Sequence, residues 1–160
     1  MTHSNPLHLC LAGNQHDTFF QQVYAETRED LQGLDSNDAV IAQLIRMQYQ
    51  AQKQGYQQDY PDANYYVIEW QGEACGRLIL DQRKTQVQVV DIAVLKQRRN
   101  HGIGSAIFNY LQQQSRAKQQ ILYLNMNLNN QGLKRFYQRL GFKKAKQQSE
   151  NPLYQTLRYF

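Results

Sequence analysis

The sequence has little cysteine and little proline, and it has no long apolar run. Its 160 residues include two cysteines, three prolines and one tryptophan. Cys10 and Cys75 are too few for a disulfide scaffold and lack metal-ligand spacing, so we expect both to be small core residues. No stretch of about 18 uncharged apolar residues is present, which predicts that the chain has no membrane span.

The first residues also lack a targeting signal. The segment MTHSNPLHLCLAGNQ has no basic region followed by an apolar run of signal-peptide length. We therefore expect a cytoplasmic protein that does not associate with a membrane. The length, together with a hydrophobic content of 41%, predicts one domain with a core of its own.

Acidic residues are fewer than basic ones. Eighteen Lys and Arg residues against 13 Asp and Glu residues give a formal net charge of +5. This excess favours an anionic partner, such as nucleic acid, acidic lipid or a phosphorylated small molecule. Nucleic-acid binding predicts basic and aromatic residues interleaved on one surface. Here the basic residues gather near Lys96, Arg98 and Arg99 and in the last helix, so we disfavour nucleic acid as the partner.

The spacing of apolar residues predicts a mixed α/β (α+β) domain in the order β-α-α-β-β-β-α-β-α-β. Strands are expected at 7–11, 65–70, 74–80, 85–95, 121–128 and 153–160. Helices are expected from 20 to a stop near Gly33, from Ser36-Asn37-Asp38 to near Gly55, from 103 to 118, and from Asn130 to Gly141. The sheet should be largely antiparallel at its start.

The strand at 85–95 changes phase half-way along. Val87 and Val89 share one face, whereas Val90, Ile92 and Val94 would lie on the other. Such a slip means either that both faces are buried or that a β-bulge redirects the side chains.

Asp91 interrupts this apolar strand. It could act as a base or anchor a substrate amine. Alternatively, it could pair with an arginine such as Arg77 or Arg28. Both interpretations predict a contact, because a buried carboxylate needs a partner.

A loop with two glycines, RRNHGIGSAIF at 98–108, connects this strand to the next helix. Helix N-termini carry unpaired N–H groups and a positive dipole end, and glycines allow close approach of a phosphate. The loop therefore either cradles a pyrophosphate or is an ordinary turn. The Walker A loop and the dinucleotide fingerprint both fail to match it.

Two motifs resemble those of the GNAT acetyltransferase superfamily. Asp91-Ile92-Ala93-Val94 followed by Arg99-x-x-Gly102-x-Gly104 is similar to the family's Gln/Arg-x-x-Gly-x-Gly/Ala motif after a strand. Downstream, Asn130, Tyr137 and Gly141-Phe142 resemble its second motif. The resemblance covers nearly the whole chain. It implies a single GNAT-like domain at 1–160 with six or seven strands and about four helices. The CoA-binding core would be at about 85–142 and the acceptor-side helices at about 15–55.

The resemblance implies acetyl-CoA as co-substrate and no metal. The pantetheine arm would pair with the backbone of Ile92, Ala93 and Val94, between strands 85–95 and 121–128, and with Asn130. Tyr137, which is otherwise typical of a core residue, would protonate the leaving thiolate. Residues implied at the pyrophosphate are Arg99, Asn100, His101, Gly102, Ile103, Gly104 and Ser105.

Gln88 and Asn125 stand where some family members carry glutamates. Neither side chain can act as a base, so deprotonation of the acceptor falls to water, Asp91, or a tyrosine such as Tyr24 or Tyr56.

The resemblance implies that the first helices form one wall of the acceptor pocket. We therefore expect Arg28, Tyr56 and Tyr60 to contact the acceptor. An arginine at this wall suits a carboxylate or phosphate.

The implied function is acetyl-CoA-dependent N-acetyltransfer to a primary amine of a small molecule, protein or peptide, by direct transfer in a ternary complex. Two other classes stay open, namely a CoA-binding sensor without turnover and a basic nucleic-acid-binding domain. The sequence leaves open the acceptor, the acyl chain preference and the choice between monomer and homodimer.

Overall fold

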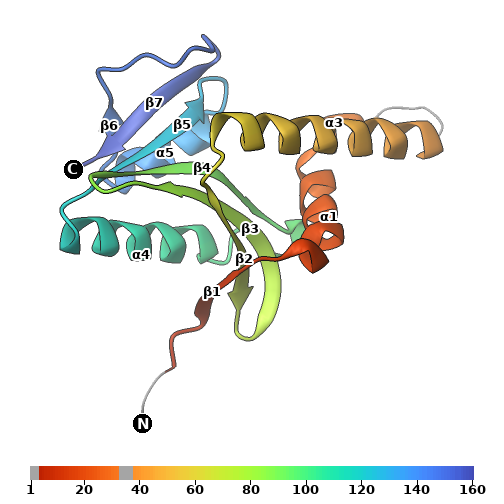
Figure 1. The fold of residues 1–160 in the computed structure, drawn as a ribbon, viewed down its shortest axis with the longest axis horizontal. Coiled ribbons are helices and arrows are strands. Elements are labelled where there is room, and N and C mark those ends of the chain that lie inside the picture. Colours follow the sequence, from red (N-terminus) through yellow and green to blue (C-terminus); the bar gives the residue numbers. More distant parts are fainter. Residues whose placement is uncertain (1–3, 33–37) are drawn as a thin grey trace.

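In the computed structural model, which describes residues 4–32 and 38–160, an open sheet of seven strands carries helices on both faces (Figure 1). The strands are β1 (Leu7–Leu11), β2 (Asn64–Trp70), β3 (Glu73–Gln82), β4 (Gln86–Val94), β5 (Ile121–Asn127), β6 (Lys143–Lys144) and β7 (Tyr154–Tyr159). The helices are α1 (Asp17–Thr27), α2 (Glu29–Gln32), α3 (Asp38–Asp59), α4 (Ile103–Ala117) and α5 (Gln131–Arg139), with 3-10 turns at Asn14–His16 and Lys96–Arg98.

The strand order is β1-β2-β3-β4-β5-β7-β6. Within the described ranges, β4 and β5 form the one parallel pair, and every other neighbouring pair is antiparallel. The mixed, mostly antiparallel sheet is confirmed. The two-residue strand β6 was not predicted, because it is too short to show a period of two.

Two hydrophobic cores lie on opposite faces of the sheet, and the adjacent residues Val67 and Ile68 of β2 belong to different ones. Val67 packs with Phe20 of α1 and Tyr49 of α3. Ile68 belongs to the larger core, which includes residues of α4 and α5. This division follows from the alternation of side chains along a strand. It sets α1 and α3 on one face of the sheet, with α4 and α5 on the other.

A β-bulge in β4 resolves the phase slip. Ile79 pairs with Asp91 and Leu80 with Val89, so Val90 is the extra residue. Ile92 and Val94 thereby return to the same core as Val89. The other alternative, a strand with apolar residues buried on both faces, is therefore excluded. Asp91 is left on the face of α1 and α3.

The helix at α3 continues to Asp59, and the prediction that it ends near Gly55 is wrong. A Cβ at Gly55 would meet open space, so this glycine lies in the helix without a packing or turn requirement. Val40 and Met47 of this helix are 59% and 62% exposed. Figure 1 shows why, because the first turns of α3 extend past the sheet.

The expected helix from 20 onward is two helices. α1 ends at Thr27, whose hydroxyl donates to the carbonyl of Tyr24 at 2.6 Å, and α2 begins at Glu29. The predicted stop at Gly33 and the predicted cap at Ser36 and Asn37 lie outside the described residues. The strand predicted at 74–80 is longer in the structure, where β3 runs from Glu73 to Gln82.

Candidate active site

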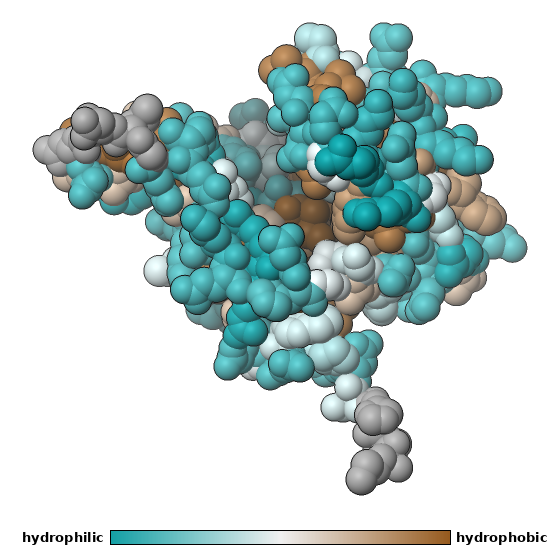
Figure 2. Space-filling model, turned by 180° about the vertical axis from the view of Figure 1, so that it is seen from behind, coloured by the Kyte–Doolittle hydropathy of each residue, from teal (hydrophilic) through white to brown (hydrophobic). Residues whose placement is uncertain are grey.

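The central opening of the sheet lies where β4 parts from β5. The parallel pairing begins at Gln86↔Ile121 and stops at Val89↔Leu124, immediately before the bulge. Beyond that point β4 pairs with β3 alone, from Asp91 to Val94. One edge of β4 is therefore open between the two strands, and Figure 2 shows an apolar hollow near the middle of the molecule as seen from behind.

Backbone polar groups face this opening. The N–H of Leu95 donates to the carbonyl of Cys75 on β3 at 2.8 Å. Since N–H and C=O groups alternate in direction along a strand, those of Val94 and Ile92 point away from β3 and into the opening. The strand edge thus offers the N–H groups of Ile92 and Val94 and the carbonyl of Ile92 to an extended ligand, whereas the Val94 carbonyl accepts from Arg99.

The two-glycine loop ends at the N-terminus of α4. Gly102 is the N-cap residue, with φ of 81°, and Asn100 also has positive φ, at 64°. The helix has no side-chain cap, and its first internal bond runs from Ala106 N–H to Gly102 C=O at 3.0 Å. The N–H groups of residues 103–105 precede that bond and find no partner in the described part of the chain. They form the anion-binding end of a helix. His101 is exposed beside them, whereas the Ile103 side chain lies in the core.

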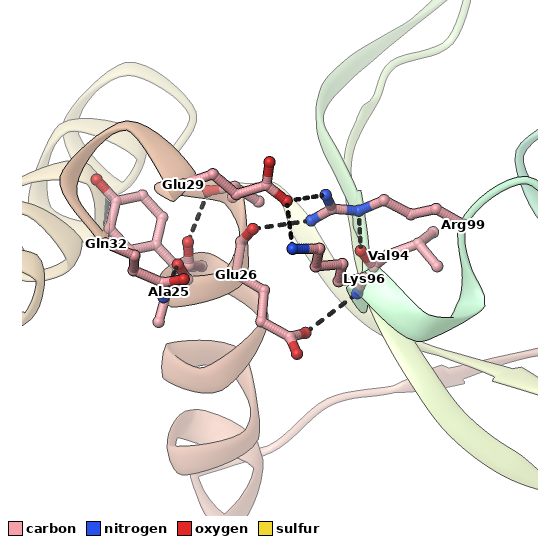
Figure 3. A network of polar contacts seen from close by, with 9 residues as sticks. Ala25, Glu26, Glu29, Gln32, Val94, Lys96 and Arg99 are labelled. Atoms are coloured by element: carbon pink, nitrogen blue, oxygen red, sulfur yellow. Dashed lines mark hydrogen bonds and ion pairs between the residues drawn. The ribbon is translucent and has the colours of Figure 1, made fainter. Parts of the chain in front are cut away.

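Arg99 connects this loop to α1 and α2 (Figure 3). Its Nε donates to the carbonyl of Val94 at 3.0 Å, Nη2 to the carbonyl of Glu26 at 3.0 Å, and Nη1 to the Glu29 carboxylate at 3.2 Å. The Lys96 N–H adds a bond of 3.2 Å to Glu26 Oε2. Each guanidinium nitrogen of Arg99 has a protein partner, and these contacts hold the loop against β4, α1 and α2.

Asp91 pairs with Arg77, as one of the two alternatives predicted. Asp91 Oδ2 lies 2.6 Å from Nη2 and 3.1 Å from Nε of Arg77. Oδ1 makes no hydrogen bond to the described residues and is not enclosed. The Asp91 side chain is 21% exposed and that of Arg77 is 4% exposed. The pair is thus anchored in the fold, with one carboxylate oxygen left open.

Tyr137 is buried on α5, within an aromatic cluster that includes Phe108 and Phe142. Its hydroxyl makes no hydrogen bond to the described residues and is not among the enclosed orphan atoms. Burial, and then the charge of Asp91, raises the pKa of Tyr137 to about 12. The phenol therefore keeps its proton at neutral pH.

Asn130 caps α5, as predicted. Its side-chain oxygen accepts a hydrogen bond from the Leu133 N–H at 3.0 Å. Asn130 itself is exposed, between β5 and α5.

Residues 61–144 match the family model of the acetyltransferase (GNAT) domain. The chain belongs to this family.

Relatives of this GNAT chain are distant in sequence. An uncharacterised N-acetyltransferase of Lactobacillus delbrueckii subsp. lactis is 25% identical over 131 residues, which cover 76% of each chain. The PaiA N-acetyltransferase of Thermoplasma acidophilum, solved in complex with coenzyme A, has a TM-score of 0.67 and 13% identity over 95% of this chain and 97% of its own. An acetyltransferase of Thermus thermophilus has a TM-score of 0.66 and 13% identity over 99% of both chains. These structures confirm the predicted fold.

Of the expected acceptor contacts of the GNAT chain, Tyr56 alone lies near Asp91. Burial, and then the charge of Asp91, raises the pKa of Tyr56 above its usual range, so this tyrosine cannot serve as a base at neutral pH. Tyr60 lies nearer to Asp59 and Asp81. Tyr24, the other tyrosine considered as a base, accepts a hydrogen bond from Arg28.

Arg28 is tied to its own neighbourhood. Its Nε and Nη2 donate to the two Asp30 oxygens at 3.1 and 3.0 Å, and Nη1 donates to Tyr24 and Gln48. Each guanidinium nitrogen of Arg28 thus has a partner among the described residues. Of the two arginines that the sequence offered as partners of Asp91, Arg77 is the one that contacts it.

Among the described residues, no group of three or more His, Cys, Asp or Glu side chains is placed to hold a metal ion. No helix of the same residues is long and apolar enough to cross a membrane.

Proposed function

We propose that this GNAT protein transfers the acetyl group of acetyl-CoA directly to a primary amine of a small molecule or peptide, with both bound at once. The observation that carries the proposal is the parting of β4 from β5 beside the uncapped N-terminus of α4. An extended strand edge and a helix end with free N–H groups fit a pantetheine arm joined to a pyrophosphate. Two solved neighbours, the PaiA enzyme with coenzyme A and Arabidopsis thaliana Naa50 with a CoA–peptide bisubstrate analogue, support this fit.

The residues assigned to the cofactor are those at the open edge and in the loop. Ile92 and Val94 bind the extended arm through backbone groups, with Ala93 holding β4 to β3. Asn130 flanks the arm from the other side. The pyrophosphate is bound by backbone N–H groups of the loop and helix end, namely Asn100, His101, Gly102, Ile103, Gly104 and Ser105.

Acetyl-CoA, when bound, supplies a thioester-activated acyl group. The N–H of Ile92 or Val94 can then donate to the acyl oxygen as negative charge develops on it. Asp91 Oδ1 accepts a hydrogen bond from the incoming amine and orients it. The proton of that amine leaves to Asp91 or to water, because Gln88 and Asn125 are not bases. Asn125 Oδ1 is occupied by the Thr156 hydroxyl at 2.8 Å.

Tyr137 is the acid in this scheme. Its raised pKa keeps the phenol protonated, and an open hydroxyl with no partner among the described residues can donate to a leaving thiolate. Tyr56, also protonated and near Asp91, contributes to the acceptor wall.

A CoA-binding sensor is the second candidate. The observation that favours it is the absence of both glutamates, together with the use of Asp91 Oδ2 by Arg77. Both candidates share cofactor binding and differ in turnover.

Two measurements on the purified protein separate these outcomes. Thermal unfolding should show stabilisation by acetyl-CoA and by CoA but not by ATP, of about 2.7 kcal/mol at 100 times the dissociation constant. Release of free thiol should then be followed with a panel of small amines and N-terminal peptides. Asp91→Asn and Tyr137→Phe should slow release, whereas Tyr110→Phe, a change at an exposed site on α4, should not. Stabilisation without turnover on any amine indicates the sensor. If neither acetyl-CoA nor CoA stabilises the protein, both candidates are contradicted.

A further inference from the structure

A cavity of about 290 Å³ lies on the α1 and α3 face of the sheet, separate from the opening between β4 and β5. Its volume is near the lower limit of ligand pockets, which is about 300 Å³. Its wall includes Leu11, Ala12, Phe20, Lys53, Tyr65 and Arg77. Tyr56, which we assign to the acceptor wall, also lines this cavity, whereas the groups proposed to bind the cofactor do not.

Arg77 contributes a free donor to this wall. The side chain is 4% exposed, and its guanidinium lies over the ring of Phe20, 5.7 Å from the centroid. Nε and Nη2 donate to Asp91, and Nη2 also donates to Gln52 Oε1 at 2.9 Å. Nη1 makes no hydrogen bond to the described residues and is not enclosed by protein. A buried cation with an unused nitrogen on a cavity wall can bind an anion.

Tyr65 contributes a second unused group. Its hydroxyl is enclosed and makes no hydrogen bond in the part of the chain that the structure describes. Tyr65 pairs with Ile79 and Val67 pairs with Arg77, so Tyr65 and Arg77 are diagonal neighbours on one face of adjacent strands. Burial raises the pKa of the phenol, which therefore keeps the proton that it can donate. A buried hydroxyl without a partner is costly unless a ligand satisfies it.

The acidic group on the same wall is already satisfied. Asp17 accepts from Tyr49 at 2.6 Å, from Lys53 at 3.1 Å and from Gln21 at 3.0 Å. Nη1 of Arg77 and the Tyr65 hydroxyl are thus two donors on this wall without a partner among the described residues. A planar carboxylate has two oxygens, which can accept from a guanidinium nitrogen and a neighbouring hydroxyl together. The ring of Phe20 offers an apolar surface to the rest of such a ligand.

We propose that this cavity is a binding site for a small organic acid, whose carboxylate accepts from Nη1 of Arg77 and the hydroxyl of Tyr65 and whose apolar part lies against Phe20. The site is distinct from the cofactor opening. The Arg77 side chain connects the cavity to the cofactor opening, because the guanidinium that would bind the carboxylate also holds Asp91. The acid could be part of the amine acceptor or a separate effector.

Binding can be measured by titrating the protein with propionate and benzoate, each against its uncharged amide, with NMR observation of the tyrosine ring signals. Saturable shifts are expected with the carboxylates and not with the amides. Tyr65→Phe removes one donor to a charged acceptor, so it should weaken carboxylate binding about tenfold. Tyr66→Phe is the matched control, because Tyr66 is the next residue of β2, faces the opposite side and bonds Gln82 at 3.1 Å. It should leave binding unchanged.

The proposal is overturned if no carboxylate binds saturably, if the amides bind equally well, or if Tyr65→Phe binds like the parent protein. Arg77→Gln should also abolish binding, but it removes the partner of Asp91, so Tyr65→Phe is the deciding variant. The source of the acid follows from competition with an amine acceptor. A carboxylate that belongs to the acceptor site raises the apparent KM of the acceptor, whereas an effector binds together with it. The NMR titration requires no turnover, so its failure is distinguishable from failure of the transferase proposal.

Discussion

Arg77 holds Asp91 through two nitrogens that contact one oxygen, with Nη2 at 2.6 Å and Nε at 3.1 Å from Oδ2. This arrangement fixes the carboxylate while leaving Oδ1 open. It depends on the bulge at Val90, which turns Asp91 to the face where β3 carries Arg77. One strand irregularity therefore sets the position of the group that we assign to the amine.

Replacing Arg77 alone should lower the free energy of unfolding more than replacing Arg77 and Asp91 together. Arg77→Met leaves a partly buried carboxylate without a counter-charge, and we expect it to lower the free energy of unfolding by about 3–5 kcal/mol. Adding Asp91→Asn to this variant should restore part of the loss, because the amide needs no cation. Urea unfolding of the two single variants and the double variant measures the coupling. Additive losses would mean that the two side chains do not interact.

Tyr137→Phe should separate catalysis from stability. The hydroxyl makes no hydrogen bond to the described residues, so the free energy of unfolding should change by less than about 0.5 kcal/mol. Loss of a general acid should lower kcat by about 10² to 10⁴. Steady-state kinetics and urea unfolding of the same preparation test both statements. An unchanged kcat removes Tyr137 from the mechanism, and a large loss of stability assigns it to the core.

Stability should decline in alkaline solution. Burial raises the pKa of Tyr137 from its ordinary 10.0 to about 12, and those of Tyr49 and Tyr56 still higher. The unfolded chain therefore releases these protons at a lower pH than the folded one. The contribution to stability is complete below pH 10 and is lost as the pH rises toward 12. Urea unfolding from pH 8 upward should show a falling midpoint above about pH 10, and a flat profile there would contradict the burial of these phenols.

Two glycine substitutions should have opposite signs. Gly102 has φ of 81°, where an added Cβ is strained although it meets no atom within 4 Å, so Gly102→Ala should destabilise by about 1–2 kcal/mol. It should also weaken CoA binding, because the loop must shift. Gly55→Ala places a better helix former in open space and should stabilise by up to about 1 kcal/mol. Thermal unfolding with and without CoA compares the two, and equal effects would exclude a special role for Gly102.

Arg99 and Arg98 offer a matched pair of adjacent arginines. Arg99→Gln breaks the contacts to Val94, Glu26 and Glu29 and should cost about 1–2 kcal/mol of stability while raising the KM for acetyl-CoA. Arg98 pairs with Glu73 at the surface, so Arg98→Gln should cost less than about 1 kcal/mol and leave the KM unchanged. Equal effects on the KM would mean that the link from loop to helices does not order the cofactor site.

The sequence predicted most of this fold because its signals are local. β1 begins and ends as its apolar pattern indicates, Asn130 caps α5, and both GNAT motifs lie where strand, loop and helix predictions put them. The end of α3 was predicted wrongly because it does not follow from a local signal. A glycine at position 55 is an ordinary stop signal, and local sequence does not report that Tyr56 is partly buried beyond it.

The site was less accessible to sequence reasoning because it depends on pairing between strands. The alternatives for Val90 were settled by the register of β3 on β4, which the sequence does not specify. The same register selects Arg77 and not Arg28 as the partner of Asp91. The free nitrogen of Arg77 and the orphan hydroxyl of Tyr65 become neighbours only when β2 pairs with β3.

The most direct test of cofactor binding in the opening between β4 and β5 is backbone amide NMR on isotopically labelled protein titrated with CoA. Binding between these strands predicts saturable shifts for the amides of Ile92 and Val94 and for those of residues 103–105, with β1 unaffected. Saturable shifts confined to another basic surface, such as Lys143 and Lys144 of β6, would contradict it.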